Sequence, residues 1–207
     1  MTLSTPAEIE ALFTRRDGQY LFARWGRPIV PVVFGVDDAT LGVIKGAIEA
    51  VVALAGHKMA ETDPESGANL MMFFFEAWDE LLDLPDLDKM IDGLAPMVAR
   101  LKAQDANQYR VFRFDAAGTI RAAFVFVRLD GALSQTPAAD LALFQAVQVI
   151  LLWSEDAFDT VSPLARAGDT AVLRPEVAAL IRAGYDPVMP AVARDPSHAL
   201  RLAARAA

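Results

Sequence analysis

Two segments of the chain are apolar at almost every position, which is unusual for a strand with one face in water. The first is NLMMFFF at residues 69–75, and the second runs from Ala122 to Val127 within TIRAAFVFVRLD. Successive side chains of a strand point to opposite faces of a sheet, so such runs predict strands that are buried on both faces. We therefore expect these two strands at the centre of a sheet that carries helices on one or both faces.

A hairpin and an edge strand complete the predicted sheet. The segments 108–115 and 119–130 flank Ala116-Ala117-Gly118, and this spacing with a turn glycine is typical of a β-hairpin. The segment RPIVPVVFG is extended, and its prolines suit an edge strand because proline cannot donate a hydrogen bond to a neighbouring strand. Together the segments predict an α+β fold with a mostly antiparallel, four- to five-stranded sheet packed with helices.

Capping residues and apolar spacing predict the helices. Thr5, Pro6 and Glu8 form a capping-box pattern at the first of them. The predicted helices run from Pro6 to near Arg16, from Asp37 or Asp38 to Gly56, over 78–84, over 87–104 with a break or kink at Pro96, over 141–153 after a Thr136 cap, from Pro175 to Ala183, and from an Asp195 cap to the end. We expect an α+β core domain at residues 1–161 and a helical C-terminal extension at 162–207 packed on it.

Composition argues against several classes of protein. Hydrophobic residues make up 54% of the chain and the mean hydropathy is +0.29, yet no apolar run reaches the roughly 20 residues that a membrane-spanning helix needs. The opening MTLSTPAEIE lacks the features of a signal peptide, which favours a cytoplasmic protein. The absence of cysteine rules out disulfides and thiolate chemistry.

Negative charge is concentrated in one stretch. The formal net charge is −8, and residues 61–92 alone contain ten acidic residues and one basic residue, Lys89. An acidic chain disfavours nucleic-acid binding, because phosphate contacts supply most of that affinity. We interpret the stretch as a solvated surface with turn and cap residues; the alternative is a docking surface for a basic partner.

Common catalytic and cofactor motifs are missing from the sequence. No glycine-rich phosphate loop follows a predicted strand, and no G-x-S-x-G sequence is present. His57 and His198 are the two histidines, and neither has acidic neighbours at the spacing of metal ligands. We therefore expect no catalytic residue, no metal and no cofactor.

Two glutamines interrupt the most apolar helix of the chain, LALFQAVQVILLW. Gln145 and Gln148 share one helical face with Leu141 and Leu152. A buried glutamine must find partners for its amide, since an unpaired polar group costs about 1–3 kcal/mol. This face is therefore interpreted either as an exposed or sheet-edge side of the helix, or as the wall of a polar network or wet cleft.

The glutamine helix resembles the active-site helix of zincin metallopeptidases, which carries His-Glu-x-x-His and follows the strand at the rim of the cleft. Phe144 stands at the position of the first His, Gln145 at that of the Glu and Gln148 at that of the second His. Farther on, VAALIRAGYDPVMP is similar to the L-x-x-L-Y-D-P…P tail of a bacterial family of uncharacterised zincin-like proteins. The resemblance covers residues 28–190 and implies that 119–128 forms the rim strand.

The residues that replace His, Glu and His at the three motif positions imply a site without catalysis. Phe144 has no lone pair for zinc, and the Gln145 amide cannot take up a proton as a general base. Gln148 is at best a weak oxygen ligand, because zinc prefers imidazole, thiolate or carboxylate. The resemblance thus implies a catalytically inactive, zincin-like protein whose cleft persists as a binding groove.

The preferred hypothesis is a non-catalytic binding or scaffold protein for an unknown protein or small ligand. Its candidate groove contacts are Gln145, Gln148, Glu155, Asp156 and Tyr185. One alternative is a metal-independent, hydrolase-like enzyme that uses carboxylates. Another is an acidic regulatory protein that docks through residues 61–92. A homodimer would help to cover the apolar excess.

Overall fold

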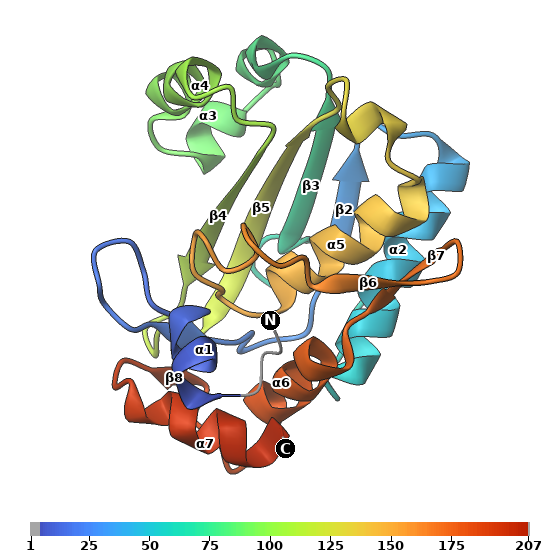
Figure 1. Ribbon diagram of the computed structural model, residues 1–207. Coiled ribbons are helices and arrows are strands. Elements are labelled where there is room, and N and C mark those ends of the chain that lie inside the picture. Colours follow the sequence, from blue (N-terminus) through green and yellow to red (C-terminus); the bar gives the residue numbers. More distant parts are fainter. Residues whose placement is uncertain (1–4, 207) are drawn as a thin grey trace.

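A four-stranded mixed sheet forms the centre of the computed structural model, which describes residues 5–206 (Figure 1). The strand order is β2-β3-β5-β4. The strands are β2 (Pro31–Phe34), β3 (Leu70–Phe75), β5 (Ile120–Arg128) and β4 (Gln108–Phe114). The two continuously apolar strands, β3 and β5, thus lie inside the sheet, and the proline-containing β2 lies at an edge. The predicted α+β class is confirmed.

The strand directions correct the mostly antiparallel sheet expected from the sequence. β3 pairs in parallel with both β2 and β5, whereas β4 and β5 form an antiparallel hairpin. Helix α2 (Asp38–Leu54) explains the first parallel pair, because it carries the chain from the end of β2 back to the start of β3. The turn at Gly118, where φ is 83°, reverses the chain so that β5 runs alongside β3.

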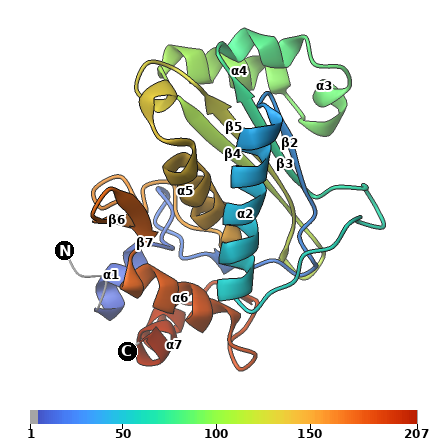
Figure 2. The ribbon, with the colours of Figure 1, turned by 90° about the vertical axis from the view of Figure 1, so that its right-hand side faces the viewer.

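Helices cover both faces of the sheet (Figures 1 and 2). On one face, α2 and α5 (Ala138–Ile150) share a hydrophobic cluster with Leu70, Met72 and Phe74 of β3. On the other face, Phe73 and Phe75 of the same strand join a second cluster. That cluster is built with η1 (Trp78–Leu82), α3 (Leu87–Met90) and α4 (Leu94–Ala103). The two-sided burial expected for this strand is confirmed.

The first helix, α1 (Pro6–Ala11), is shorter than predicted. Its capping box is present, with Thr5 accepting from the Glu8 backbone and the Glu8 side chain accepting from the Thr5 backbone. The helix ends well before Arg16 because Thr14 forms a β-bridge with Tyr20, and this pairing requires extended backbone.

The predicted 87–104 helix is two helices, and the break is not at Pro96. α3 and α4 are separated at residues 91–93, where Gly93 adopts a positive φ of 71°. Pro96 lies in the first turn of α4, where a backbone N–H has no partner within the helix, so proline is tolerated. The prediction that Thr136 caps the next helix is also wrong, since its hydroxyl donates to the Ala132 carbonyl instead.

Residues 162–207, expected as a helical extension, contain strands as well as helices. These elements are β6 (Leu164–Ala167), β7 (Thr170–Leu173), α6 (Pro175–Tyr185), β8 (Val192–Ala193) and α7 (Ser197–Ala206). β8 pairs with β1 (Phe22–Ala23), far away in the sequence. Leu180 and Leu202 belong to the same hydrophobic cluster as α2 and α5. No helix within residues 5–206 is both long enough and apolar enough to cross a bilayer.

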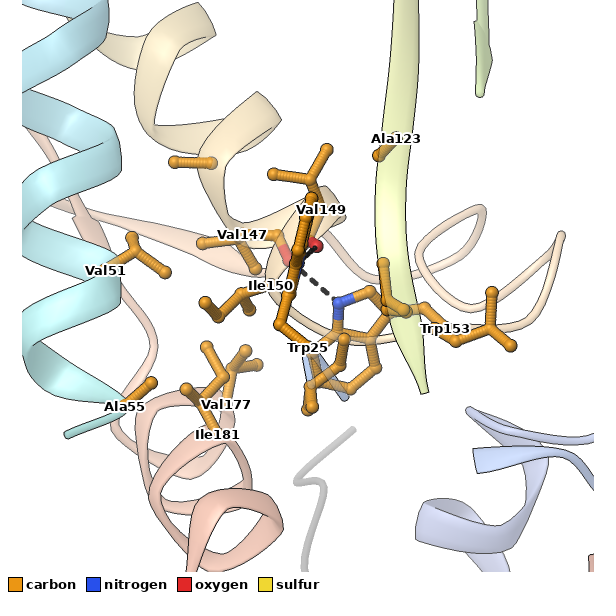
Figure 3. Packing of buried hydrophobic residues seen from close by; sticks show 14 of the residues in the cluster. Trp25, Val51, Ala55, Ala123, Val147, Val149, Ile150, Trp153, Val177 and Ile181 are labelled. Atoms are coloured by element: carbon orange, nitrogen blue, oxygen red, sulfur yellow. Dashed lines mark hydrogen bonds between the residues drawn. The ribbon is translucent and has the colours of Figure 1, made fainter. Parts of the chain in front are cut away.

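Indole side chains hold the C-terminal end of α5, which lies among the packed residues drawn in Figure 3. The last carbonyls of a helix have no partner within the helix and need donors from elsewhere. The Val147 carbonyl accepts from the Trp153 indole, and the Val149 carbonyl accepts from the Trp25 indole, each at 2.8 Å. These bonds fix the end of the helix that carries both glutamines.

Candidate functional site

A groove of about 800 Å³ lies between the edge strand β4 and the second half of α5. The segments 15–16, 100–107 and 152–159 complete its walls. Aromatic side chains from these elements line much of it: Tyr109, Phe112, Phe144, Trp153 and Phe158. The rim strand is therefore β4, not the expected 119–128, because β5 lies inside the sheet with β4 on its outer side.

Gln145 lies in a closed polar network behind the groove wall. Its side chain is fully buried. Its Nε2 donates to Gln108 Oε1 at 2.6 Å, and its Oε1 accepts from Arg110 Nη2 at 2.9 Å. Arg110 Nη2 also donates to Gln108 Oε1 at 3.0 Å. Gln108, Arg110 and Gln145 thus form a triad in which each side chain bonds to the other two. Gln145 thereby joins α5 to β4 instead of facing solvent.

Gln148 and Phe144, one helical turn apart, both line the groove. Gln148 is half-buried. Phe144 and Gln148, at the first and third positions matched to the zincin motif, thus line the groove. Gln145, at the second position, lies behind the groove wall.

Glu155 lines the groove, whereas Asp156 lies beside it in an ion pair with the 15–16 turn. Glu155 Oε1 is 3.5 Å from Arg15 Nη1, and Arg16 Nε donates to Asp156 Oδ1 at 3.0 Å. The hydrogen bond from Arg16 lowers the pKa of the Asp156 carboxyl below its ordinary value. Both carboxylates are thus paired with arginines.

Tyr185 contributes to the helix end and not to the groove. Its hydroxyl donates to the Ile150 carbonyl at 2.8 Å and accepts from the Trp25 backbone N–H at 3.4 Å. Burial raises the pKa of this phenol above its ordinary value. Tyr185 therefore provides a third donor to the C-terminal carbonyls of α5.

The sequence analysis missed Arg110, which is the central charged residue of the site. Gln108, Arg110 and Phe112 alternate along β4 and line the groove, so the polar positions of QYRVFRFD carried a signal. No carboxylate in residues 5–206 forms an ion pair with Arg110. Burial lowers the pKa of its guanidinium to about 10, which leaves it protonated at neutral pH.

A second cavity of about 440 Å³ adjoins the groove. It lies between the first half of α5, the residues just before it and the β6–β7 hairpin, and it shares Gln108 and Phe144 with the groove. The two hollows thus meet at Gln108, whose side-chain oxygen accepts from both Gln145 and Arg110.

The histidines lie outside both hollows. His57 Nε2 is 2.8 Å from the Arg27 carbonyl, and His198 Nδ1 is 2.8 Å from the Tyr20 hydroxyl. Within residues 5–206, no three histidine, aspartate or glutamate side chains are grouped so that they could share a metal ion.

Comparison of the chain with models of protein families, with curated proteins and with solved structures finds no match.

Proposed function

We propose that this is a non-catalytic binding protein on a degenerate zincin-like fold, and that its ligand occupies the groove between β4 and α5. The observation that carries the proposal is the placement of Phe144 and Gln148. They stand where the zincin motif has histidines, and both line a groove of about 800 Å³. A cavity of this size falls within the range that small-molecule sites occupy in proteins.

The chemistry of the groove favours binding over catalysis. An amide and a phenyl ring neither take up a proton nor activate water near neutral pH. Gln145, at the position of the general base, already uses both ends of its amide in hydrogen bonds to β4. The aromatic walls provide apolar area, and the Arg110 triad provides a small number of fixed polar groups, which is the usual composition of a ligand site.

The test is a screen of fluorinated fragments by ¹⁹F NMR, with the contact region located by backbone amide shifts. Gln148→Trp fills the groove, and Glu49→Trp, on the exposed side of α2, is the matched control. We expect fragments that shift the amides of β4 and α5 to lose binding in Gln148→Trp and to keep it in Glu49→Trp. Fragments that bind only elsewhere, or equally to both variants, would contradict the proposal.

The acidic stretch supports a second candidate function, docking of a basic partner. Leu82, Leu84 and Met90 are exposed large hydrophobic residues within residues 61–92. Apolar side chains surrounded by charge of one sign are common at protein interfaces. Charge reversal of Asp83 and Asp86 to lysine would abolish such docking, as measured by co-purification from the native host at low and high salt.

A further inference from the structure

The arginines that line the groove differ in whether their guanidinium groups are paired with a carboxylate. Arg15 Nη1 donates to the Trp153 carbonyl at 2.7 Å and lies near Glu155, and Arg16 is held by Asp156. Arg100 lies over the Tyr109 ring, with its guanidinium carbon 5.1 Å from the ring centroid. Arg100 and Arg110 are thus the two groove arginines without an ion pair among residues 5–206, and Arg110 is the one whose guanidinium is held by hydrogen bonds to Gln108 and Gln145.

The donors of Arg110 are only partly used by the protein. Both Nη2 hydrogens are engaged, one by Gln108 and one by Gln145. Its Nε is buried and has no acceptor. Its Nη1 also has no acceptor among residues 5–206 and is not fully buried, and the residue lines the groove. A guanidinium with a free pair of hydrogens favours an anionic partner, because bonds to a charged acceptor are about twice as strong as neutral ones.

We propose that Arg110 binds the carboxylate of a small organic acid whose apolar body lies against Phe112 and Phe144. This assignment rests on the proposed groove function and adds the chemical class of its ligand. Gln108 and Gln145 hold the guanidinium in place before the ligand arrives, which reduces the entropy lost on binding. Phe112 and Phe144 line the same groove from β4 and α5.

Charge explains why the ligand is a carboxylate rather than a phosphate ester. Arg100 lies over Tyr109, which packs against the second cluster, on the face of β4 opposite to α5. On the α5 face the groove therefore offers one guanidinium without a counter-charge, that of Arg110, which matches a single negative charge. Glu155 and Asp159 line the same groove, and their carboxylates would repel a group with two charges. Arginine also matches the planar geometry of a carboxylate.

The experiment compares phenylacetate, phenylacetamide and inorganic phosphate as probes by amide-detected NMR titration. We expect phenylacetate to shift the amides of β4 and α5, and to bind at least about tenfold more tightly than the uncharged amide. Phosphate should cause no shifts in the groove. Equal affinity for acid and amide, or tighter binding of phosphate, would overturn the carboxylate assignment.

Variants locate the charge that is responsible. Arg110→Met should weaken phenylacetate binding about tenfold or more and weaken phenylacetamide binding much less. Arg113→Met, on the same strand but outside the groove lining, is the matched control and should bind like the wild type. Arg110→Lys keeps the charge and should retain part of the affinity, which separates loss of charge from loss of folding.

The outcomes distinguish this assignment from the groove function on which it rests. If phenylacetate and phenylacetamide both bind in the groove with the same affinity, the groove function stands and the carboxylate assignment is rejected. If phenylacetate binding survives in Arg110→Met, the assignment to this residue is rejected. If neither probe binds, the carboxylate assignment is rejected, and the groove function is decided by the fragment screen.

Discussion

Replacement of Gln145 by leucine tests whether the polar triad holds α5 against β4. Leucine is close in size to glutamine and leaves little cavity, so the change mainly removes hydrogen bonds. One is the neutral bond to Gln108, worth about 0.5–1.5 kcal/mol, and the other is the bond from the Arg110 guanidinium, worth about 1.5–3 kcal/mol. The expected loss is therefore about 2–4.5 kcal/mol in the free energy of unfolding.

Urea denaturation followed by circular dichroism measures this loss, and the thermal midpoint should fall by about 5–15 °C for a chain of this size. Gln148→Leu is the matched control, because Gln148 lies on the same helix and has no hydrogen bond that the change would break. It should stay within about 0.5 kcal/mol of the wild type. Equal, small effects of the two changes would refute the view that the triad stabilises the fold.

Three further predictions address the core, the metal and the pH dependence. Phe74→Ala and Phe124→Ala remove buried rings on opposite faces of the sheet, and each should cost about 3–5 kcal/mol in urea denaturation; an unchanged midpoint for either would mean that its face is not packed. Protein purified without a histidine tag should contain no stoichiometric zinc by elemental analysis, whereas one zinc per chain that is lost in Gln148→Ala would contradict the degenerate-site hypothesis. Burial lowers the pKa of His198 to about 4, so its neutral form stabilises the fold fully above the unfolded pKa of about 6.5. This contribution should be lost as the pH falls from about 6.5 to about 4, and the decline in thermal midpoint over this window should be shallower in His198→Gln.

The parts of the fold that follow from local sequence could be predicted. Uninterrupted apolar runs identified β3 and β5 as internal strands, since no other placement buries both faces. The turn at Gly118 identified the β4–β5 hairpin. Strand direction was not predictable in this way, because it depends on the side from which the chain re-enters the sheet after α2 and after α4.

The centre of the site was harder to predict because it joins residues that are far apart in the sequence. Gln145 was singled out as a polar residue on an apolar helix, but its partners lie 35 and 37 positions earlier on β4. Nothing local distinguishes Arg110 from Arg113, which has the same neighbours in the pattern but points to the other side of the strand. Only the packing of α5 beside the edge strand makes one of them a groove residue.

The donors that cap α5 have a consequence for the order in which the protein matures on the ribosome. The Val149 carbonyl accepts from the indole of Trp25, which is synthesised before the helix. The Ile150 carbonyl accepts from the hydroxyl of Tyr185, which lies 35 residues downstream. Until α6 has been synthesised, the Ile150 carbonyl lacks its Tyr185 donor, and α5 lacks the apolar partners that α6 supplies, Val177 and Ile181 among them. A chain that ends before residue 175 therefore contains the two indole donors of this helix end but not the phenol donor.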